Sequence, residues 1–410
     1  MMVLGQIARY LRWIGVASLA AALLACGDEG GSKLESQSGA SSLMGRTLAE
    51  GSFGGQYVFV ASTTGNRVHV FDFDTLQPIK TIEVANQPSE IHAHPDGKSV
   101  WVLSREAAEL TTINVAALEV HSTHATGARP THSYFAPGYG SFWVGNDGSG
   151  DVSVYELRSG HETRVLTGSG HHKMAFASDE SGALRFAYVS NISDSTITAI
   201  AAGDPPSAVS TISVGSAPHG MDFSSVTRQV YNCSGDAQNS VEVIATEGAQ
   251  IHQVVGRIPL PSRCGFLHVE EEGRAAFVTL KEANLLVRID LQTQALSSFA
   301  TGAGPDKFEL DGARAFVSNV EEASVSVIDL QGAGQARSIP VGAAVLPGAT
   351  GNAHRGLRTF ETKLFVPNPA ADSVSVIDSA SETLITTLEG IANPSGIAIA
   401  GVRGGTTYPR

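Results

Sequence analysis

The sequence predicts an all-β protein, an eight-bladed β-propeller, and three observations support this fold class. One motif recurs along most of the chain, for example in Phe316-Val-Ser-Asn319 and Phe365-Val-Pro-Asn368. Short apolar runs alternate with polar residues at a period of two, which is typical of β-strands. No helical pattern of ten residues separates these runs. A fixed repeat of this kind is typical of solenoids, propellers and arrays.

The length of the repeat indicates the size of each structural unit. Eight equivalent positions, each at the end of a stretch like Val325-Ser-Val-Ile-Asp329, follow one another at intervals of 39 to 49 residues. These positions are Asp72, Asn114, Glu156, Ala201, Ala245, Asp290, Asp329 and Asp378. Each unit holds four short apolar runs, and four antiparallel strands in about 40–45 residues match one propeller blade. Counting predicts eight blades, or seven only if one unit is displaced.

The repeated sequence motifs resemble those of the YVTN β-propeller repeat family, which is also called YncE-like. In this sequence the motifs are Tyr188-Val-Ser-Asn191, Thr211-Ile-Ser-Val-Gly215, Val325-Ser-Val-Ile-Asp329 and Pro394-Ser-Gly-Ile-Ala398. The resemblance covers roughly residues 55 to 400, by the repeat criterion. It implies that Pro-x-Gly-Ile-Ala begins the inner strand of a blade and that Tyr-Val-x-Asn forms the second strand. It is specific for the fold and says little about activity.

This strand order predicts how the ring closes. The first recognisable run, residues 57 to 61, is a second strand, and the last, residues 396 to 400, is an inner strand. We therefore expect the N- and C-terminal strands to pair within one blade, which leaves no open sheet edge. The propeller is expected to span residues 53 to 402, with a tail at residues 403 to 410.

Residues 1 to 25 resemble a bacterial lipoprotein signal peptide. Arg9 and Arg12 precede an apolar stretch that is too short to cross a bilayer as a helix. Leu23-Leu24-Ala25-Cys26 resembles a lipobox, which implies cleavage before Cys26 and lipidation of its sulfur. An ordinary signal peptide with a chance cysteine is the alternative. Because Gly27 and not Asp follows the cysteine, we expect an outer-membrane anchor that presents the protein to the periplasm or the cell surface.

Residues 26 to 52 are rich in Gly, Ser, Ala and Glu and are predicted to form a flexible tether, because such a stretch cannot bury a core. The net charge of −13 and the absence of any basic run argue against a nucleic-acid partner, whose phosphates require clusters of Lys and Arg. We expect a monomer that meets the membrane only through its lipid anchor. A periplasmic or cell-surface protein is the expected partner.

Candidate functional residues emerge when the eight predicted inner strands are placed in register, since inner strands line the central channel. The position after the Pro reads Ser89, Thr131, His172, His219, Cys264, Asp306, His354 and Ser395. The next position reads Glu90, His132, Lys173, Gly220, Gly265, Lys307, Arg355 and Gly396. Both columns are expected at one mouth of the channel.

The first column suggests a transition-metal site. His172, His219 and Cys264 are the expected ligands, with Cys233 or Asp306 as a fourth, because thiolate and imidazole ligands suit copper or zinc. No compact CxxC motif supports this hypothesis. An alternative stays open, in which Cys233 and Cys264 form a disulfide and the histidines bind only water and loop carbonyls. No cofactor other than such a metal is predicted.

The second column suggests a small-ligand site. Lys173, Lys307 and Arg355 can attract an anion or a carboxylate. His132 belongs to the same column, and His354 lies two blades from Cys264, where it serves a ligand or a second ion better than the first metal. These five residues, Lys173, Lys307, His354, Arg355 and His132, are the predicted cofactor-binding or ligand-binding set.

Two functions follow from these features. The first is a lipid-anchored extracytoplasmic propeller that acts as a binding or interaction module, with a metal or small-ligand site at the channel mouth. The alternative is a periplasmic metal-dependent, copper-like redox enzyme or a metal-handling accessory protein. The sequence contains no Gly-x-Ser-x-Gly elbow, phosphate loop or dinucleotide fingerprint, so no catalytic residue is assigned.

Overall fold

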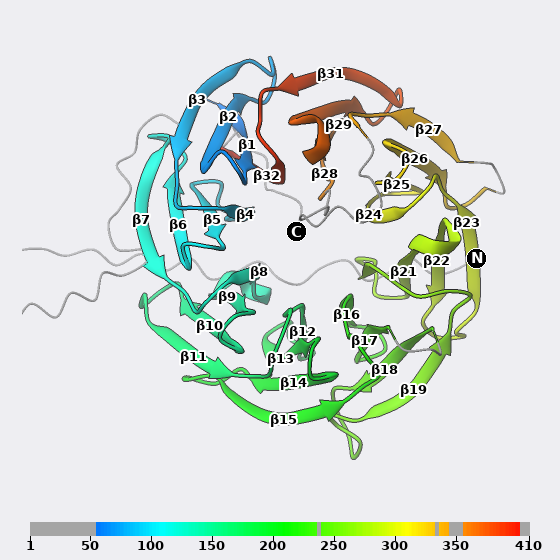
Figure 1. Cartoon of the computed structure of the whole chain (residues 1–410). Coiled ribbons are helices and arrows are strands. Elements are labelled where there is room, and N and C mark those ends of the chain that lie inside the picture. The colour runs from blue at the N-terminus through cyan, green and yellow to red at the C-terminus, as the bar shows by residue number, and fades with distance from the viewer. Residues whose placement is uncertain (1–54, 236–238, 333–335, 344–355, 402–410) are drawn as a thin grey trace, which may run out of the picture. The chain divides into compact units, whose positions relative to one another are not determined.

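The computed structural model describes residues 55 to 401, except residues 236–238, 333–335 and 344–355. These residues form eight four-stranded antiparallel sheets, arranged as the blades of a propeller (Figure 1). The predicted eight-bladed β-propeller is confirmed. No helix in this part of the chain is long and apolar enough to cross a membrane. The predicted signal peptide, the lipidation site Cys26, the tether and the tail lie outside the described residues.

Each blade is described here from its inner to its outer strand. Blade 1 contains β32 (Pro394–Gly401), β1 (Gln56–Ser62), β2 (Arg67–Asp72) and β3 (Pro78–Glu83). Blade 2 contains β4 (Pro88–Ala93), β5 (Ser99–Ser104), β6 (Glu109–Asn114) and β7 (Glu119–Ala125). Blade 3 contains β8 (Pro130–Phe135), β9 (Ser141–Asn146), β10 (Asp151–Glu156) and β11 (Glu162–Leu166). Blade 4 contains β12 (Met174–Ser178), β13 (Leu184–Asn191), β14 (Thr196–Ala201) and β15 (Ser207–Ser213).

The second half of the ring follows the same order. Blade 5 contains β16 (Met221–Ser224), β17 (Gln229–Ser234), β18 (Ser240–Ala245) and β19 (Val254–Pro259). Blade 6 contains β20 (Leu267–Val269), β21 (Ala275–Leu280), β22 (Leu285–Asp290) and β23 (Leu296–Ala300). Blade 7 contains β24 (Pro305–Asp311), β25 (Arg314–Asn319), β26 (Ser324–Asp329) and β27 (Arg337–Pro340). Blade 8 contains β28 (Arg358–Phe360), β29 (Lys363–Asn368), β30 (Ser373–Asp378) and β31 (Thr383–Glu389). The described 3-10 helices are η1 (Pro137–Tyr139), η2 (Lys281–Ala283) and η3 (Pro369–Ala371).

The ring closes within blade 1, as the strand order predicts. β1 pairs with β32 in an antiparallel register that places Tyr57 opposite Ala400 and Phe59 opposite Ala398. In Figure 1 the blue strands of the N-terminal side and the red β32 belong to the same blade. The first and last described strands therefore hold the ring shut by a full strand of backbone hydrogen bonds.

The core consists of apolar layers between neighbouring blades. Side chains alternate across each strand, so β1 sends Phe59 and Ala61 into the layer shared with blade 2. The same strand sends Val58 and Val60 into the layer shared with blade 8. Both faces of the second strand of a blade are thus buried, which explains why these strands are apolar over most of their length.

The asparagine of the repeat motif joins two strands of one blade. In blade 7 the Asn319 amide Nδ2 donates to Ser324 Oγ and Ser326 Oγ, each at 2.8 Å. In blade 4 the Asn191 amide donates in the same way to Thr196 Oγ1 and Thr198 Oγ1, each at 3.0 Å. Because both asparagines are fully buried, these bonds satisfy amide hydrogens that have no access to water. The motif Val-Ser-Asn followed by Ser-Val-Ser is therefore a structural unit.

The inner strands begin at the predicted proline in four blades, at Pro88, Pro130, Pro305 and Pro394. In blades 4, 5, 6 and 8 the strand begins later than predicted, for example at Met174 in place of Gly170. Gly170 has a φ of +98°, a conformation that does not continue a β-strand. Residues 171 to 173 therefore enter the channel region as an irregular segment.

Candidate functional site

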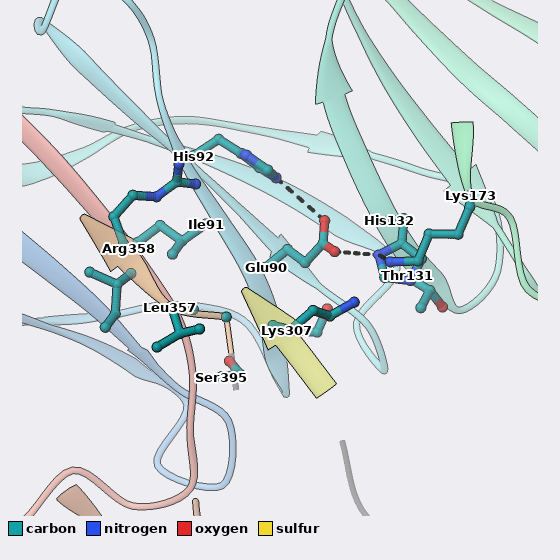
Figure 2. Close-up of a pocket in the computed structure, with 14 residues that line it drawn as sticks. Glu90, Ile91, His92, Thr131, His132, Lys173, Lys307, Leu357, Arg358 and Ser395 are labelled. Carbon is teal, nitrogen blue, oxygen red and sulfur yellow. Dashed lines mark hydrogen bonds and ion pairs between the residues drawn. The ribbon is translucent and has the colours of Figure 1, made fainter. Parts of the chain in front are cut away.

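A cavity of about 150 Å³ opens where the first residues of several inner strands meet (Figure 2). We call it the mouth cavity. Its polar lining residues are Ser89, Glu90, His92, Thr131, His132, Lys173, Lys307, Arg358 and Ser395. They come from blades 1, 2, 3, 7 and 8 and from the segment that leads into blade 4, so the closed ring alone brings them together.

Glu90 is the most heavily bonded residue of the mouth cavity. Its Oε1 contacts His132 Nδ1, and its Oε2 lies 3.3 Å from His92 Nε2 (Figure 2). The same Oε2 accepts hydrogen bonds from the backbone N–H and the hydroxyl of Ser133, at 2.8 and 3.2 Å. Burial alone raises the pKa of Glu90, but His132 and His92 together bring this pKa well below its ordinary value. The carboxylate is therefore charged and is hydrogen-bonded by its neighbours.

A pair of facing imidazoles extends this network. His132 Nε2 and His171 Nε2 lie 2.6 Å apart, and the two ring planes are almost perpendicular. The Nδ1 atom of each ring faces a carboxylate: that of His132 contacts Glu90, and that of His171 lies 3.3 Å from Asp147 Oδ2. Burial and the charge of Lys173 hold the pKa of His132 well below its ordinary value. We call His132 and His171 the imidazole pair.

Asp147 is itself held in place from two sides. Its Oδ2 accepts a 2.5 Å hydrogen bond from Thr131 Oγ1, and its Oδ1 accepts a 3.2 Å bond from the backbone N–H of His172. The guanidinium of Arg105 lies 4.0 Å from Oδ2. Both carboxylates behind the imidazole pair are therefore positioned by other groups, as is typical for carboxylates that orient functional histidines.

Two lysines line the mouth cavity, Lys173 from the segment that leads into blade 4 and Lys307 from β24 of blade 7. Lys173 Nζ lies 3.2 Å from His132 Nδ1, and Lys307 Nζ lies 4.1 Å from the centre of the Phe266 ring. Burial and the like charge of Lys307 lower the pKa of Lys173 to about 7. Burial also lowers the pKa of Lys307. The cavity therefore presents amines whose charges repel each other and would be stabilised by an anion.

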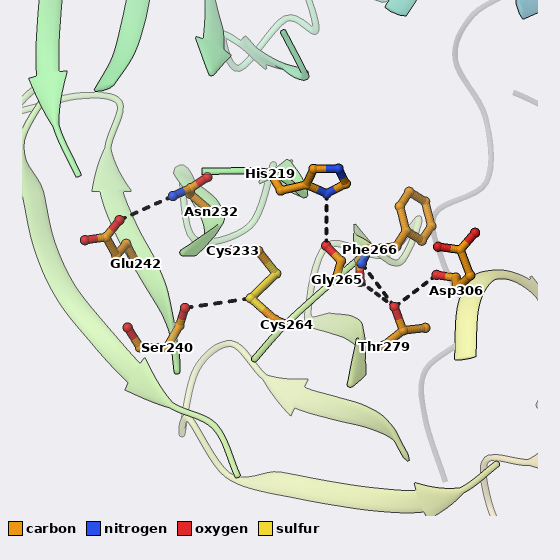
Figure 3. The surroundings of a disulfide bond; sticks show 10 residues. All are labelled: His219, Asn232, Cys233, Ser240, Glu242, Cys264, Gly265, Phe266, Thr279 and Asp306. Carbon is orange, nitrogen blue, oxygen red and sulfur yellow. Dashed lines mark hydrogen bonds between the residues drawn. A yellow bond between two sulfur atoms is a disulfide. The ribbon is translucent and has the colours of Figure 1, made fainter. Parts of the chain in front are cut away.

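The two cysteines of the propeller form a disulfide (Figure 3). Their Cα atoms lie 5.7 Å apart, and both side chains are buried in the layer between blades 5 and 6. Neither sulfur of Cys233 or Cys264 is a thiolate in this state. Of the two sequence interpretations, the structure favours the disulfide over metal ligation by these residues.

The other predicted metal ligands occupy separate environments. His172 is 0% exposed, and its Nε2 lies 2.9 Å from Thr167 Oγ1. The ring of His219 stacks parallel to that of His171 with centroids 5.5 Å apart, and its Nδ1 lies 3.4 Å from the carbonyl oxygen of Gly265. Asp306 is the second residue of β24. Within the described ranges, no three His, Cys, Asp or Glu side chains are arranged to hold a metal ion.

The structure brings together most residues of the second predicted column. Glu90, His132, Lys173 and Lys307 all line the mouth cavity. His354 and Arg355 lie outside the described residues. Sequence reasoning missed His171, Asp147 and Arg358. The available signal for His171 was its position beside His172, since either of two adjacent histidines can be the one that faces the channel.

Comparisons with known proteins agree with the fold. No protein-family model matches this chain, and no curated protein matches it. The chain is similar in structure to AztD from Citrobacter koseri, with 14% identity and a TM-score of 0.64 over 86% of this chain and 99% of that chain. It is also similar to the dihydro-heme d1 dehydrogenase NirN in complex with DHE, with 17% identity and a TM-score of 0.62 over 83% and 74%. Hydrazine synthase from Kuenenia stuttgartiensis matches with 16% identity and a TM-score of 0.54 over 72% and 96%. At these identities the likeness establishes the β-propeller fold alone.

Proposed function

We propose that this chain is a lipid-anchored extracytoplasmic binding module that takes up a small anion in the mouth cavity. One observation carries the proposal: Lys173 and Lys307 line the same cavity, where burial lowers the pKa of both amines and the charge of Lys307 lowers the pKa of Lys173 further. Two like charges in a region that water reaches poorly are costly unless an opposite charge joins them. The neighbouring propeller structures support a binding role of this kind at the level of the fold.

The lining of the mouth cavity favours a carboxylate or an inorganic oxyanion. Arg358 adds a guanidinium to the two amines, and Ser89, Thr131 and Ser395 add hydroxyl groups. Glu90 offsets only part of this charge: it favours the protonated forms of both lysines, but in the lining of the cavity two amines and one guanidinium face a single carboxylate. Ion pairs and charge-assisted hydrogen bonds of this kind recognise small anions.

Calorimetric titration with sulfate, phosphate and acetate tests this function. We expect one saturable site for at least one of these anions, and an affinity at least tenfold lower in Lys307→Met. Lys281→Met is the matched control, because Lys281 is exposed on η2 and pairs with Glu321 away from the mouth cavity. The proposal fails if no anion binds, or if both variants bind as the wild type does.

A metal ion at the imidazole pair is the second candidate. It is favoured by the orientation of His132 and His171, whose Nδ1 atoms face carboxylates while their Nε2 atoms lie 2.6 Å from each other. This is the orientation that carboxylates impose on metal-binding histidines, and imidazole suits zinc and copper. The function would then be metal handling or copper-like redox chemistry. Elemental analysis of the native protein, with and without His171→Gln, tests this candidate.

The cellular context of the proposal comes from the N-terminal sequence. We propose that Cys26 carries the lipid and that the monomeric propeller is held at the outer membrane, where a periplasmic or cell-surface protein is its partner. Cys26→Ala should move the protein from the membrane fraction to the soluble extracytoplasmic fraction. Unchanged membrane association of this variant would rule out the lipid anchor.

A further inference from the structure

A second and larger cavity, of about 850 Å³, lies among the inner strands of blades 3 to 6. We call it the aromatic cavity. Five half-buried aromatic side chains line it: Tyr134, Phe135, Tyr139, Phe176 and Phe266. Met174, Met221 and Leu267 are buried beneath them. This volume lies in the range of cavities that enclose cofactors and other small molecules, whereas the mouth cavity is much smaller.

The aromatic rings of this cavity are supported by packing. The rings of Tyr134 and Phe176 meet edge to face with centroids 5.9 Å apart. Phe176 in turn packs against the buried Trp143 with centroids 5.7 Å apart. On another wall, Phe135 and Tyr139 meet with centroids 6.2 Å apart. Aromatic faces held in this way offer flat, low-entropy contact surfaces to a planar ligand.

One polar group in the aromatic cavity is positioned for recognition. His268 Nδ1 lies 2.9 Å from Asp222 Oδ2, which also accepts a 2.9 Å hydrogen bond from the backbone N–H of Val269. Asp222 Oδ1 accepts a 2.8 Å bond from the backbone N–H of Phe223. Burial lowers the pKa of His268, but Asp222 outweighs this effect and raises the pKa above its ordinary value. The side chain of His268 is 50% exposed, so its Nε2–H can donate to a ligand.

Lys173 gives the aromatic cavity an amine in addition to the imidazole of His268. Its side chain lines both this cavity and the mouth cavity, so the two spaces adjoin at this residue. The charge of Asp222 is already matched by His268 and by two backbone donors. The cavity therefore combines a flat apolar lining with donors that favour a negative group.

We propose that the aromatic cavity binds a planar, conjugated molecule that carries a carboxylate or sulfonate group. The conjugated body lies against Tyr134, Phe176 and Phe266, and the anionic group accepts a hydrogen bond from His268. The cavity has room for several fused or linked rings. This site shares Lys173 with the proposed anion site, but its other recognition groups, His268 and the aromatic rings, line the aromatic cavity and not the mouth cavity.

Fluorescence titration of the folded native protein with 8-anilinonaphthalene-1-sulfonate, a planar aromatic anion, tests the proposal. We expect one saturable site per chain and an affinity at least fivefold lower in His268→Gln. His161→Gln is the matched control, since His161 is an exposed histidine in a turn of blade 3 outside this cavity. Tyr139→Ser on η1 removes one ring at the rim of the cavity and should also weaken binding.

Two further measurements distinguish binding at this site from binding in the mouth cavity and from nonspecific binding of the dye. Ser395→Ala, which removes a hydroxyl that lines the mouth cavity and not the aromatic cavity, should leave binding of the dye unchanged. The cationic aromatic dye thioflavin T and the non-aromatic anion acetate should not displace the bound dye. The proposal is overturned if the native protein shows no saturable binding, or if His268→Gln and Tyr139→Ser bind the dye as tightly as the wild type.

Discussion

The Nε2 atoms of His132 and His171 lie 2.6 Å apart, although 39 residues separate the two histidines in the sequence. They belong to neighbouring blades, and each is held from behind by a carboxylate. The ring geometry alone makes this meeting possible, because inner strands of adjacent blades begin side by side. Several consequences of this arrangement and of the blades around it can be measured.

Metal binding, where it occurs, should depend on the imidazole pair and not on the cysteines. We expect the affinity for zinc to fall at least about tenfold in His171→Gln, because the variant loses one of two imidazole ligands. Cys233→Ser combined with Cys264→Ser should bind zinc as the wild type does. Competition titration with a chromogenic chelator measures both. Loss of zinc from the cysteine variant alone would restore the thiolate interpretation.

The disulfide should contribute substantially to stability. Cys233 and Cys264 are 31 residues apart in the sequence, and a cross-link over such a loop restricts the unfolded chain by about 3–4 kcal/mol. The double serine variant should therefore unfold at lower urea concentration than the oxidised wild type. The reduced wild type should resemble the variant. Equal midpoints for all three proteins would show that the bond contributes nothing.

Anion binding in the mouth cavity should weaken as the pH rises through about 7. The pKa of Lys173 is about 7, so its amine is charged below this pH and neutral above it. Sulfate keeps its charge over this range, and its affinity should fall between pH 6 and pH 8. Calorimetry should show a flatter profile for Lys173→Met. A wild-type affinity that rises with pH would contradict the assignment.

The same pKa predicts the pH dependence of stability. Because the pKa of Lys173 in the folded protein lies below the value of about 10.4 for an unfolded lysine, the folded state binds fewer protons between these values. The free energy of unfolding contributed by this residue therefore rises with pH from about 7 to about 10. Urea unfolding of the wild type and Lys173→Met at several pH values isolates this contribution.

The buried asparagine of the repeat motif should contribute measurably to the free energy of unfolding. Asn319→Ala removes the amide that bonds Ser324 and Ser326 and leaves two buried hydroxyls with poorer partners. We expect a loss of about 1–3 kcal/mol in the free energy of unfolding. Asn114→Ala is a suitable comparison, since Asn114 bonds only the backbone of its own exposed turn. Equal losses in both variants would argue against a special role of the motif.

The fold was predictable from the sequence because the same motif, which defines a pair of strands, recurs along the chain. Each copy of the motif defines the same pair of strands, and the offset between the first run near Tyr57 and the last near Ala400 predicts closure within one blade. The bonds of Asn319 to Ser324 and Ser326 explain why the motif recurs, since every blade that carries them needs the same residues at the same spacing.

The candidate site was predictable only in part, and the reason is strand register. Glu90 and Lys307 were correctly placed at the mouth of the channel, whereas the fully buried His172 points away from it. Adjacent side chains of an extended segment point to opposite sides, so in the irregular entry into blade 4 Lys173 lines the mouth cavity while its neighbour His172 is buried. The state of Cys233 and Cys264 was open for another reason, because proximity of two thiols fits both a bond and a shared metal.

The shared sheet of blade 1 also imposes an order of events on biogenesis. β1 is the first described strand to be synthesised, yet its inner partner β32 is the last described one. A nascent polypeptide therefore carries an unsatisfied strand edge until β32 has been made, and such edges promote aggregation and proteolysis. The edge of β1 is thus covered only after β32 has been made, and truncated products that lack β32 are left exposed to degradation.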